Sequence, residues 1–111
     1  MIVDAHQHFW DPARGDYGWL KPDSPIHRVY APADLEPLMA ETGVDATILV
    51  QAAPTPEETD YMLGLAQATP WIPGVVGWID LLANDATDQI RRRARDVPRS
   101  SRSQSRKHCS K

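Results

Sequence analysis

Short apolar runs alternate with segments of helical periodicity along the first eighty residues of this chain. Runs of strand length occupy 1–8, 46–51 and 75–79, and two amphipathic segments, 32–42 and 56–69, separate them. Strands that alternate with helices in this way pair in parallel through right-handed crossovers. The last two runs are almost uninterrupted by polar residues, which is typical of strands covered on both faces of a sheet. The sequence therefore predicts an α/β fold built on a parallel sheet.

Local signals mark the ends of the helices. Pro32 suits a first helical turn and Gly43 a helix stop, and apolar residues recur between them at helical spacing: Leu35, Leu38 and Met39. A third helix is expected to begin near Ala86, with Asn84 or Asp85 as its cap.

The second helix has a fuller start signal. Pro56 takes the first helical position, and Thr55 precedes it as the cap. Thr55 and Glu58 have the spacing of a capping box, in which each side chain accepts the other residue's backbone amide. We expect this pair to close the helix start locally.

Two architectures accommodate such a sheet, namely a doubly wound open sheet and a closed barrel. Spacing alone does not separate them. A glycine-rich phosphate-binding turn does not follow the first strand, which disfavours a dinucleotide-binding sheet.

Two histidines, His6 and His8, stand at the end of the first apolar run. Residues i and i+2 of a strand project from one face roughly 6 to 7 Å apart, so both imidazoles can reach one metal ion or one substrate. Asp4 shares this face and is placed to fix a ring tautomer or to hold the strand end in register. The alternative is that both are structural or solvated histidines.

The segment 9–30 is rich in Pro, Gly, Asp and aromatic residues and is too long for a simple connection. Trp10, Tyr17 and Trp19 are candidates for stacking on a sugar-like ring, or alternatively for a small core within the loop itself. His27 is expected to be an exposed loop histidine.

The chain changes character after residue 90. Residues 1–90 hold three basic and fourteen acidic residues, a net −11, whereas 91–111 hold nine basic residues and one acid, a net +8. The tail suits a disordered basic arm that contacts nucleic acid, a solvated linker, or out-of-frame translation. We favour the third, because Arg, Ser and Pro are what GC-rich codons tend to yield when they are read one base out of frame, and because the break falls inside a helix. Nucleic-acid binding by the acidic first part is not expected.

Compartment signals point to the cytoplasm. The single cysteine, Cys109, excludes an internal disulfide and fits a reducing environment. Met1 to Asp4 shows no basic leader, and no run reaches the length of a membrane span.

Four separated blocks, in order, resemble the amidohydrolase-related (amidohydrolase 2) family, and within it the sugar lactonases of the L-fuconolactonase and L-rhamnonolactonase group. They are His6–Pro12 (HQHFWDP), Asp16–Leu20 (DYGWL), Leu49–Ala52 (LVQA) and Gly74–Leu81 (GVVGWIDL). The resemblance implies a TIM-type (β/α)8 barrel, a fold of about 250 residues. Residues 1–90 would then be its first three β/α units, the N-terminal part of a truncated metal-dependent hydrolase.

The family chemistry is the opening of a sugar lactone to its acid, with a lactone or sugar acid as the small-molecule partner. A divalent metal, zinc by preference, activates water or the carbonyl in metal-using members, and a carboxylate on the last strand takes the proton. Only His6 and His8 carry over as metal ligands. Gln51, Trp78 and Asp80 lie at the carboxyl ends of expected strands, where barrel enzymes place their sites, and are substrate-binding candidates with Trp10 and Trp19.

The later family features are absent from this sequence, since no histidine lies between His27 and His108. We therefore expect this chain alone to be inactive, and its open sheet edges to promote self-association or aggregation. A metal-dependent decarboxylase of the same barrel family is an alternative, and a short binding protein with a basic nucleic-acid-contacting tail is another.

Overall fold

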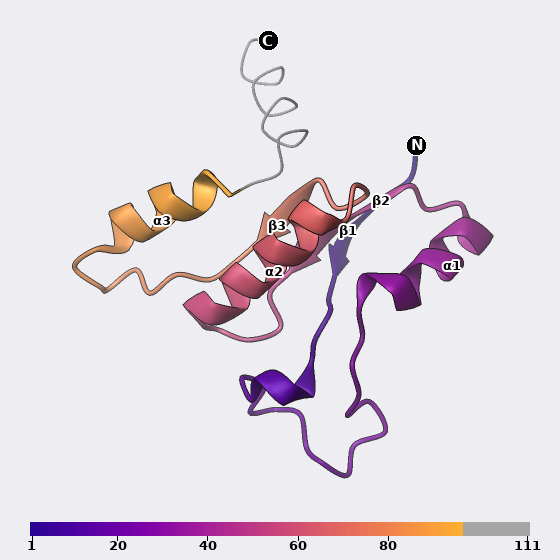
Figure 1. Ribbon diagram of the computed structural model, residues 1–111, viewed down its shortest axis with the longest axis horizontal. Coiled ribbons are helices and arrows are strands. Elements are labelled where there is room, and N and C mark those ends of the chain that lie inside the picture. The colour runs from indigo at the N-terminus through magenta and orange to yellow at the C-terminus, as the bar shows by residue number, and fades with distance from the viewer. Residues whose placement is uncertain (97–111) are drawn as a thin grey trace.

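The computed structural model describes residues 1–96 and shows an α/β arrangement (Figure 1). Strands and helices alternate along the chain as the sequence predicted. The elements are β1 (Val3–Gln7), a 3-10 turn (Pro12–Arg14), α1 (Pro32–Thr42), β2 (Ala46–Val50), α2 (Pro56–Ala68), β3 (Gly74–Val76) and α3 (Ala86–Ala94).

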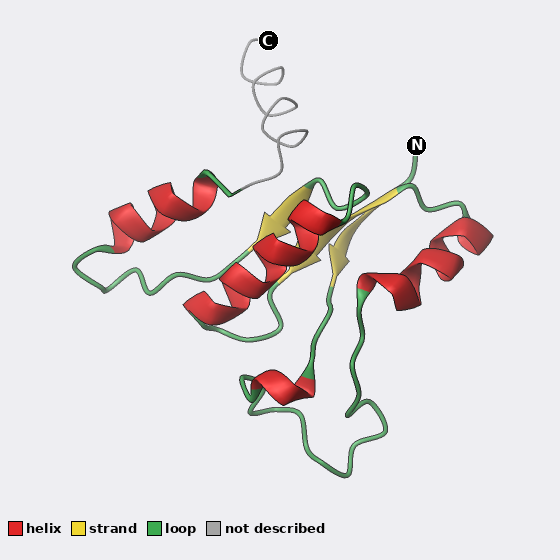
Figure 2. Cartoon of the chain, in the orientation of Figure 1, coloured by secondary structure: helices red, strands yellow, loops and turns green. Residues whose placement is uncertain are grey.

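The three strands form one parallel sheet in the order β1-β2-β3, with α2 lying across it (Figure 2). Burial along β2 alternates, since Thr47 and Leu49 are buried while Ala46, Ile48 and Val50 are half-buried. Alternation of this kind marks a sheet with one covered face. The expectation that both faces are covered is therefore wrong for the described residues, and the outer edges of β1 and β3 are unpaired there.

The core lies between the covered face of the sheet and α2. Its buried members come from the loop after β1, from β2, from α2 and from the segment before β3: Phe9, Leu49, Met62, Ala66 and Ile72. A smaller cluster of Tyr17, Leu20 and Ala53 holds the loop 9–30 together.

The first helix has the predicted ends. Pro32 occupies its first turn, and Asp34 accepts the amide of Ala31 at 2.9 Å. Gly43 ends the helix with a φ of 76° and donates to the carbonyl of Met39. Glycine adopts this left-handed conformation without the steric cost of a Cβ atom.

The capping box of α2 forms only in part. The Thr55 hydroxyl accepts the amide of Glu58 at 3.1 Å, as predicted. The Glu58 carboxylate, however, does not return to Thr55 but accepts the amide of Ala52 at 2.7 Å. The prediction of a reciprocal box is wrong, because tertiary donors occupy the carboxylate.

The third strand ends at Val76, three residues before the predicted end at Ile79. Beyond it the Thr59 hydroxyl on α2 bonds both the amide and the carbonyl of Trp78, each at 2.7 Å. The backbone at Gly77 therefore leaves the sheet and approaches α2.

The third helix begins at Ala86 as predicted, but Asp85 caps it without a side-chain bond to the backbone and instead accepts the side-chain amide of Gln89. It runs to Ala94, so the first residues of the segment expected to form a disordered tail are helical. Arg93 binds Asp60 of α2 at 2.9 and 3.1 Å, which docks this helix. Residues 97–111 of the predicted tail lie outside the described residues.

No helix within residues 1–96 combines the length and the apolar character needed to cross a bilayer.

Candidate active site

His6 and His8 converge at the carboxyl end of β1. Their Nε2 atoms lie 3.1 Å apart, and their rings meet nearly at right angles, with centroids 4.9 Å apart. A tetrahedral zinc ion with Zn–N bonds of about 2.0 to 2.1 Å separates two nitrogen ligands by about 3.4 Å. The two rings therefore fit two positions of such a site with little adjustment.

The tautomer of His8 follows from its second hydrogen bond. Its Nδ1 lies 2.8 Å from the carbonyl oxygen of Val50, which only accepts hydrogen bonds, so Nδ1 carries the proton. In neutral His8 the lone pair then lies on Nε2, on the side that faces His6. The backbone of β2 thus prepares this ring as a ligand.

Asp4 acts on the strand and not on the rings. Its carboxylate accepts the backbone amide of His6 at 3.0 Å. Of the two roles expected for Asp4, the contact made is with the backbone, while the ring orientation of His8 comes from Val50.

A pocket of about 330 Å³, here called the histidine pocket, opens beside the pair; it is lined by His8, Trp10, Trp19, Gln51 and Ala52. The structure therefore brings together four of the residues predicted from the sequence. Trp10 and Trp19 meet edge to face with centroids 5.2 Å apart. The indole of Trp19 donates to the carbonyl of Ala52 at 2.7 Å, which fixes this wall although the side chain is 47% exposed.

The other candidates lie elsewhere. Trp78 and Asp80 are not among the residues that line the histidine pocket. The Asp80 carboxylate is exposed and accepts the amide of Leu82 at 3.0 Å, as in a turn. Tyr17 is buried in the loop cluster, and His27 is exposed as expected.

Sequence reasoning missed a buried polar cluster, which contacts the histidine pocket through Ala52. Glu58 is fully buried, and one carboxylate oxygen accepts both the Tyr17 hydroxyl and the Arg14 guanidinium at 2.8 Å. The other oxygen holds the amide of Ala52. Asp16 completes the cluster by binding Arg14 at 3.4 Å and accepting the hydroxyl of Thr55.

The polar cluster also raises the pKa of the Tyr17 hydroxyl. Burial first, and then the hydrogen bond to Glu58, raise the pKa of Tyr17 well above its ordinary value. Tyr17 therefore remains a hydrogen-bond donor to Glu58 throughout the neutral range. The available sequence signal was Arg14, a cation placed between Asp11 and Asp16 in the loop.

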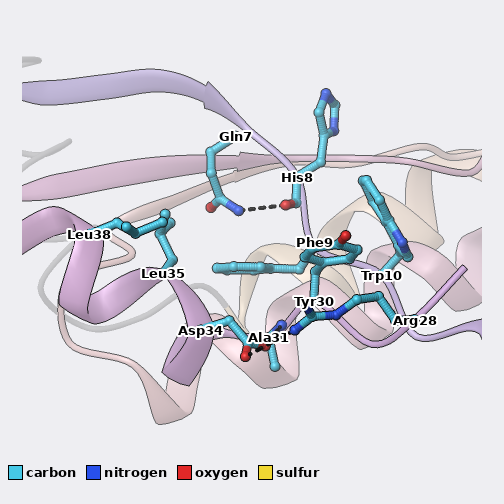
Figure 3. A pocket seen from close by; sticks show the side chains of 10 residues that line it. All are labelled: Gln7, His8, Phe9, Trp10, Arg28, Tyr30, Ala31, Asp34, Leu35 and Leu38. Atoms are coloured by element: carbon cyan, nitrogen blue, oxygen red, sulfur yellow. Dashed lines mark hydrogen bonds and ion pairs between the residues drawn. The ribbon is translucent and has the colours of Figure 1, made fainter. Parts of the chain in front are cut away.

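A second pocket, here called the α1 pocket, has a volume of about 360 Å³ and lies between the end of β1 and α1 (Figure 3). Phe9, Tyr30 and Leu35 give it apolar walls, and Arg28 and Asp34 form an ion pair of 3.5 Å at its rim. His8 contributes its backbone there, and its ring points away. Trp10 lines both pockets.

Residues 1–96 contain no cluster of three or more His, Cys, Asp or Glu side chains arranged to hold a metal ion. The histidine pair thus supplies two nitrogen ligands to any ion that binds there.

Comparison with known proteins finds similar hydrolases, although no family model matches the chain. The chain is 47% identical over 96 residues to an L-fucono-1,5-lactonase of Burkholderia ambifaria, covering 85% of this chain and 33% of that enzyme. It is 38% identical over 91 residues to an L-fucono-1,5-lactonase of Burkholderia multivorans, covering 81% and 31%.

Solved structures give the same result. A crystal structure of a Burkholderia multivorans amidohydrolase with bound zinc superposes with a TM-score of 0.74 at 37% identity, covering 82% of this chain and 32% of that one. Amidohydrolase 2 from Bifidobacterium longum subsp. infantis superposes with a TM-score of 0.55 at 30% identity, covering 67% and 30%.

The chain spans about a third of the length of the curated relatives that it matches. The resemblance inferred from the sequence blocks is confirmed: over most of its length this chain is similar in sequence and fold to amidohydrolases whose curated relatives are named L-fucono-1,5-lactonase.

Proposed function

We propose that residues 1–90 form the first three β/α units of a (β/α)8 barrel hydrolase that opens a sugar lactone, and that the basic segment 91–111, whose first residues complete α3, is not part of that barrel. The observation that carries the proposal is the convergence of the His6 and His8 Nε2 atoms beside an aromatic pocket. The identity of 47% to an L-fucono-1,5-lactonase points to an aldonolactone as the substrate class. We infer a cytoplasmic location from the single cysteine, Cys109.

His6 and His8 would hold a divalent cation, with zinc as the best fit to two imidazole ligands. When bound, such an ion supplies Lewis acidity toward a lactone carbonyl and lowers the pKa of a coordinated water. The protein's own contribution is orientation, because the carbonyl of Val50 holds His8 in the ligating tautomer. The contact of Asp4 with the His6 amide secures the strand that bears both rings.

The histidine pocket would receive the sugar ring. The edge-to-face pair of Trp10 and Trp19 offers an aromatic wall for the apolar face of a sugar, and Gln51 offers an amide that can bond ring hydroxyls. Trp78 and Asp80 follow β3, the strand next to β2. We assign them contacts with a substrate that extends beyond the histidine pocket.

The chain by itself is proposed to lack turnover. Catalytic zinc sites use three protein ligands and keep one position for water, whereas the described residues offer two histidine nitrogens at this place. A general base near the histidine pair is also needed to take the proton of the attacking water. We assign Asp4 to the strand backbone and not to this role, since its Oδ1 accepts the His6 amide.

Calorimetric zinc titration and a lactone assay test the two parts separately. We expect zinc to bind the 111-residue chain, the His6→Ala and His8→Ala variants to lose this binding, and His27→Ala to retain it. We also expect no zinc-dependent hydrolysis of L-fucono-1,5-lactone above the rate in buffer. Zinc binding that is unchanged by His6→Ala would refute the metal assignment, and turnover that disappears in His6→Ala would refute the proposed inactivity.

A further inference from the structure

Glu58 on α2 is completely buried, and its carboxylate bonds two segments of the chain that meet at the histidine pocket. One oxygen accepts the Tyr17 hydroxyl and the Arg14 guanidinium, both at 2.8 Å. The other oxygen accepts the amide of Ala52 at 2.7 Å. A single side chain therefore joins the loop 9–30 to the turn that follows β2.

Trp19 is held from two directions by groups that Glu58 anchors. The carbonyl of Tyr17 accepts the amide of Leu20 at 3.0 Å, which closes a turn that contains Trp19. At the far end of the side chain the indole donates to the carbonyl of Ala52 at 2.7 Å. Tyr17 and Leu20 are buried, whereas Trp19 is half-exposed. The indole ring is thus fixed in place without being buried.

The ring of His8 is held by different groups. Its Nδ1 lies 2.8 Å from the carbonyl oxygen of Val50, on β2. The amide of the next residue, Gln51, donates to the carbonyl of Val76 on β3 at 2.9 Å. Both bonds belong to the sheet and do not pass through Glu58. The histidine end of the pocket and its aromatic wall are therefore anchored separately.

A helix start alone would not need this arrangement. Glu58 has the spacing to bond the Thr55 amide and close the capping box at the helix surface. Burial of an acid with its partners gains little stability over apolar packing of similar volume. A buried polar cluster in which both carboxylate oxygens have donors does, however, make the groups it joins rigid. These bonds all join residues 14 to 58, so the arrangement is complete within the described part of the chain.

We propose that Glu58 is a positioning residue for substrate binding, because its bonds hold Trp19 as a preformed stacking wall for the ring of a sugar 1,5-lactone. The proposal rests on the assignment of the histidine pocket as the sugar site under the proposed function. A wall that is already fixed loses little conformational freedom when a substrate binds, which favours affinity. When the anchor is removed, only the molecules with the wall in place can bind, and the apparent Kd rises as that fraction falls.

Fluorine NMR of the 111-residue chain labelled with 5-fluorotryptophan tests the proposal. The four tryptophans give separate resonances that single phenylalanine substitutions assign. L-fucose serves as the probe, since it is a stable sugar ring with the hydroxyl arrangement of L-fucono-1,5-lactone. In the wild type we expect L-fucose to shift the resonances of Trp10 and Trp19, which line the pocket, and not that of Trp71, which packs against the core.

Tyr17→Phe removes one bond to Glu58 and should raise the Kd for L-fucose by about threefold or more. The Trp19 resonance should also move before any sugar is added. Zinc affinity, measured by calorimetry, should stay unchanged, because the sheet orients His8. Tyr61→Phe is the matched control and should retain both affinities, since it leaves the bonds of Glu58 in place. Glu58→Gln should act more strongly in the same direction, and Tyr17→Phe decides the matter if Glu58→Gln does not fold.

The outcomes are distinct. A Tyr17→Phe chain that binds L-fucose as tightly as the wild type refutes the positioning role and leaves the proposed function standing. A parallel loss of zinc and L-fucose affinity would show a general loss of structure and also refutes the positioning role. A wild-type chain in which L-fucose shifts neither Trp10 nor Trp19 refutes the sugar site itself, and the role of Glu58 with it.

Discussion

The carboxylate of Glu58 holds the backbone amide of Ala52 at 2.7 Å, although the two residues belong to different sides of the turn between β2 and α2. The carbonyl of the same Ala52 accepts the indole of Trp19. One buried acid therefore fixes the turn that follows Gln51 and, through it, a wall of the histidine pocket. Hydrogen bonds thus connect the polar cluster to the aromatic wall of the histidine pocket, from Glu58 through the Ala52 backbone to Trp19.

Glu58→Gln should destabilise the fold by about 3 kcal/mol, the usual lower end for breaking a buried charge pair. The glutamine NH2 group would replace one carboxylate oxygen and would face groups that are themselves hydrogen-bond donors. Arg14 would also lose its buried anionic partner. Urea unfolding followed by circular dichroism measures the change. The control Glu57→Gln, on the exposed side of the same helical turn, should change the unfolding free energy by less than about 0.5 kcal/mol. Equal effects at both positions would show that the cluster contributes nothing specific.

Tyr17→Phe should reduce the loss of stability at alkaline pH. The pKa of Tyr17 is raised in the folded chain, so unfolding releases its proton above the ordinary tyrosine pKa of about 10. The folded state then binds more protons than the unfolded state, and stability falls as the pH rises through this range. Unfolding free energies measured in urea at a series of pH values from neutral to strongly alkaline test this.

The phenylalanine variant should show a shallower decline than the wild type. Tyr61, whose pKa is also raised by burial first and then by the charge of Asp11, supplies part of the decline that remains. Identical slopes for the two proteins would contradict the assignment to Tyr17.

Gly77→Ala should destabilise the fold by about 1 to 3 kcal/mol, because an added Cβ would lie 2.7 Å from the Cγ2 atom of Thr59. Thr59 is buried, and its hydroxyl bonds both the amide and the carbonyl of Trp78, so the side chain has little room to move. Gly64→Ala on α2 is the matched control, since nothing lies within 4 Å of its new Cβ. Gly64→Ala should stabilise the helix by up to about 1 kcal/mol. Thermal melts of the two variants should move in opposite directions.

Trp19→Phe should cost about 1 kcal/mol, the net value of one hydrogen bond, because phenylalanine cannot donate to Ala52. The near-ultraviolet circular dichroism should also lose intensity, since the edge-to-face pair with Trp10 is removed. Lys21→Gln, an exposed substitution in the same loop, should leave the spectrum unchanged. A variant spectrum that retains the wild-type intensity would mean that the Trp10 and Trp19 pair does not persist in solution.

Features set by near neighbours were predictable from the sequence. Pro32 and Gly43 mark the ends of α1 because their backbone preferences act within a few residues. The two-residue period of a strand was enough to predict that His6 and His8 would meet, and the loop aromatics Trp10 and Trp19 do reach that place.

Features set by distant partners were not predictable in this way. The bond between Arg14 and Glu58 spans 44 positions, and with the amide of Ala52 it occupies the carboxylate that a reciprocal capping box would use. The early end of β3 has the same origin, because Thr59 on α2 captures the backbone of Trp78. Local patterns indicate which groups can bond, and packing decides which bonds form.

Trp10 is a wall common to the histidine pocket and the α1 pocket, packed between Trp19 and Tyr30 with centroids 5.2 and 5.0 Å away. Its indole donates to the carbonyl of Ile26, which limits how far the ring can turn. The two cavities are therefore not independent volumes: any turn of this indole that widens one narrows the other. A molecule lodged beside α1 would change the shape available next to the histidines without touching either imidazole.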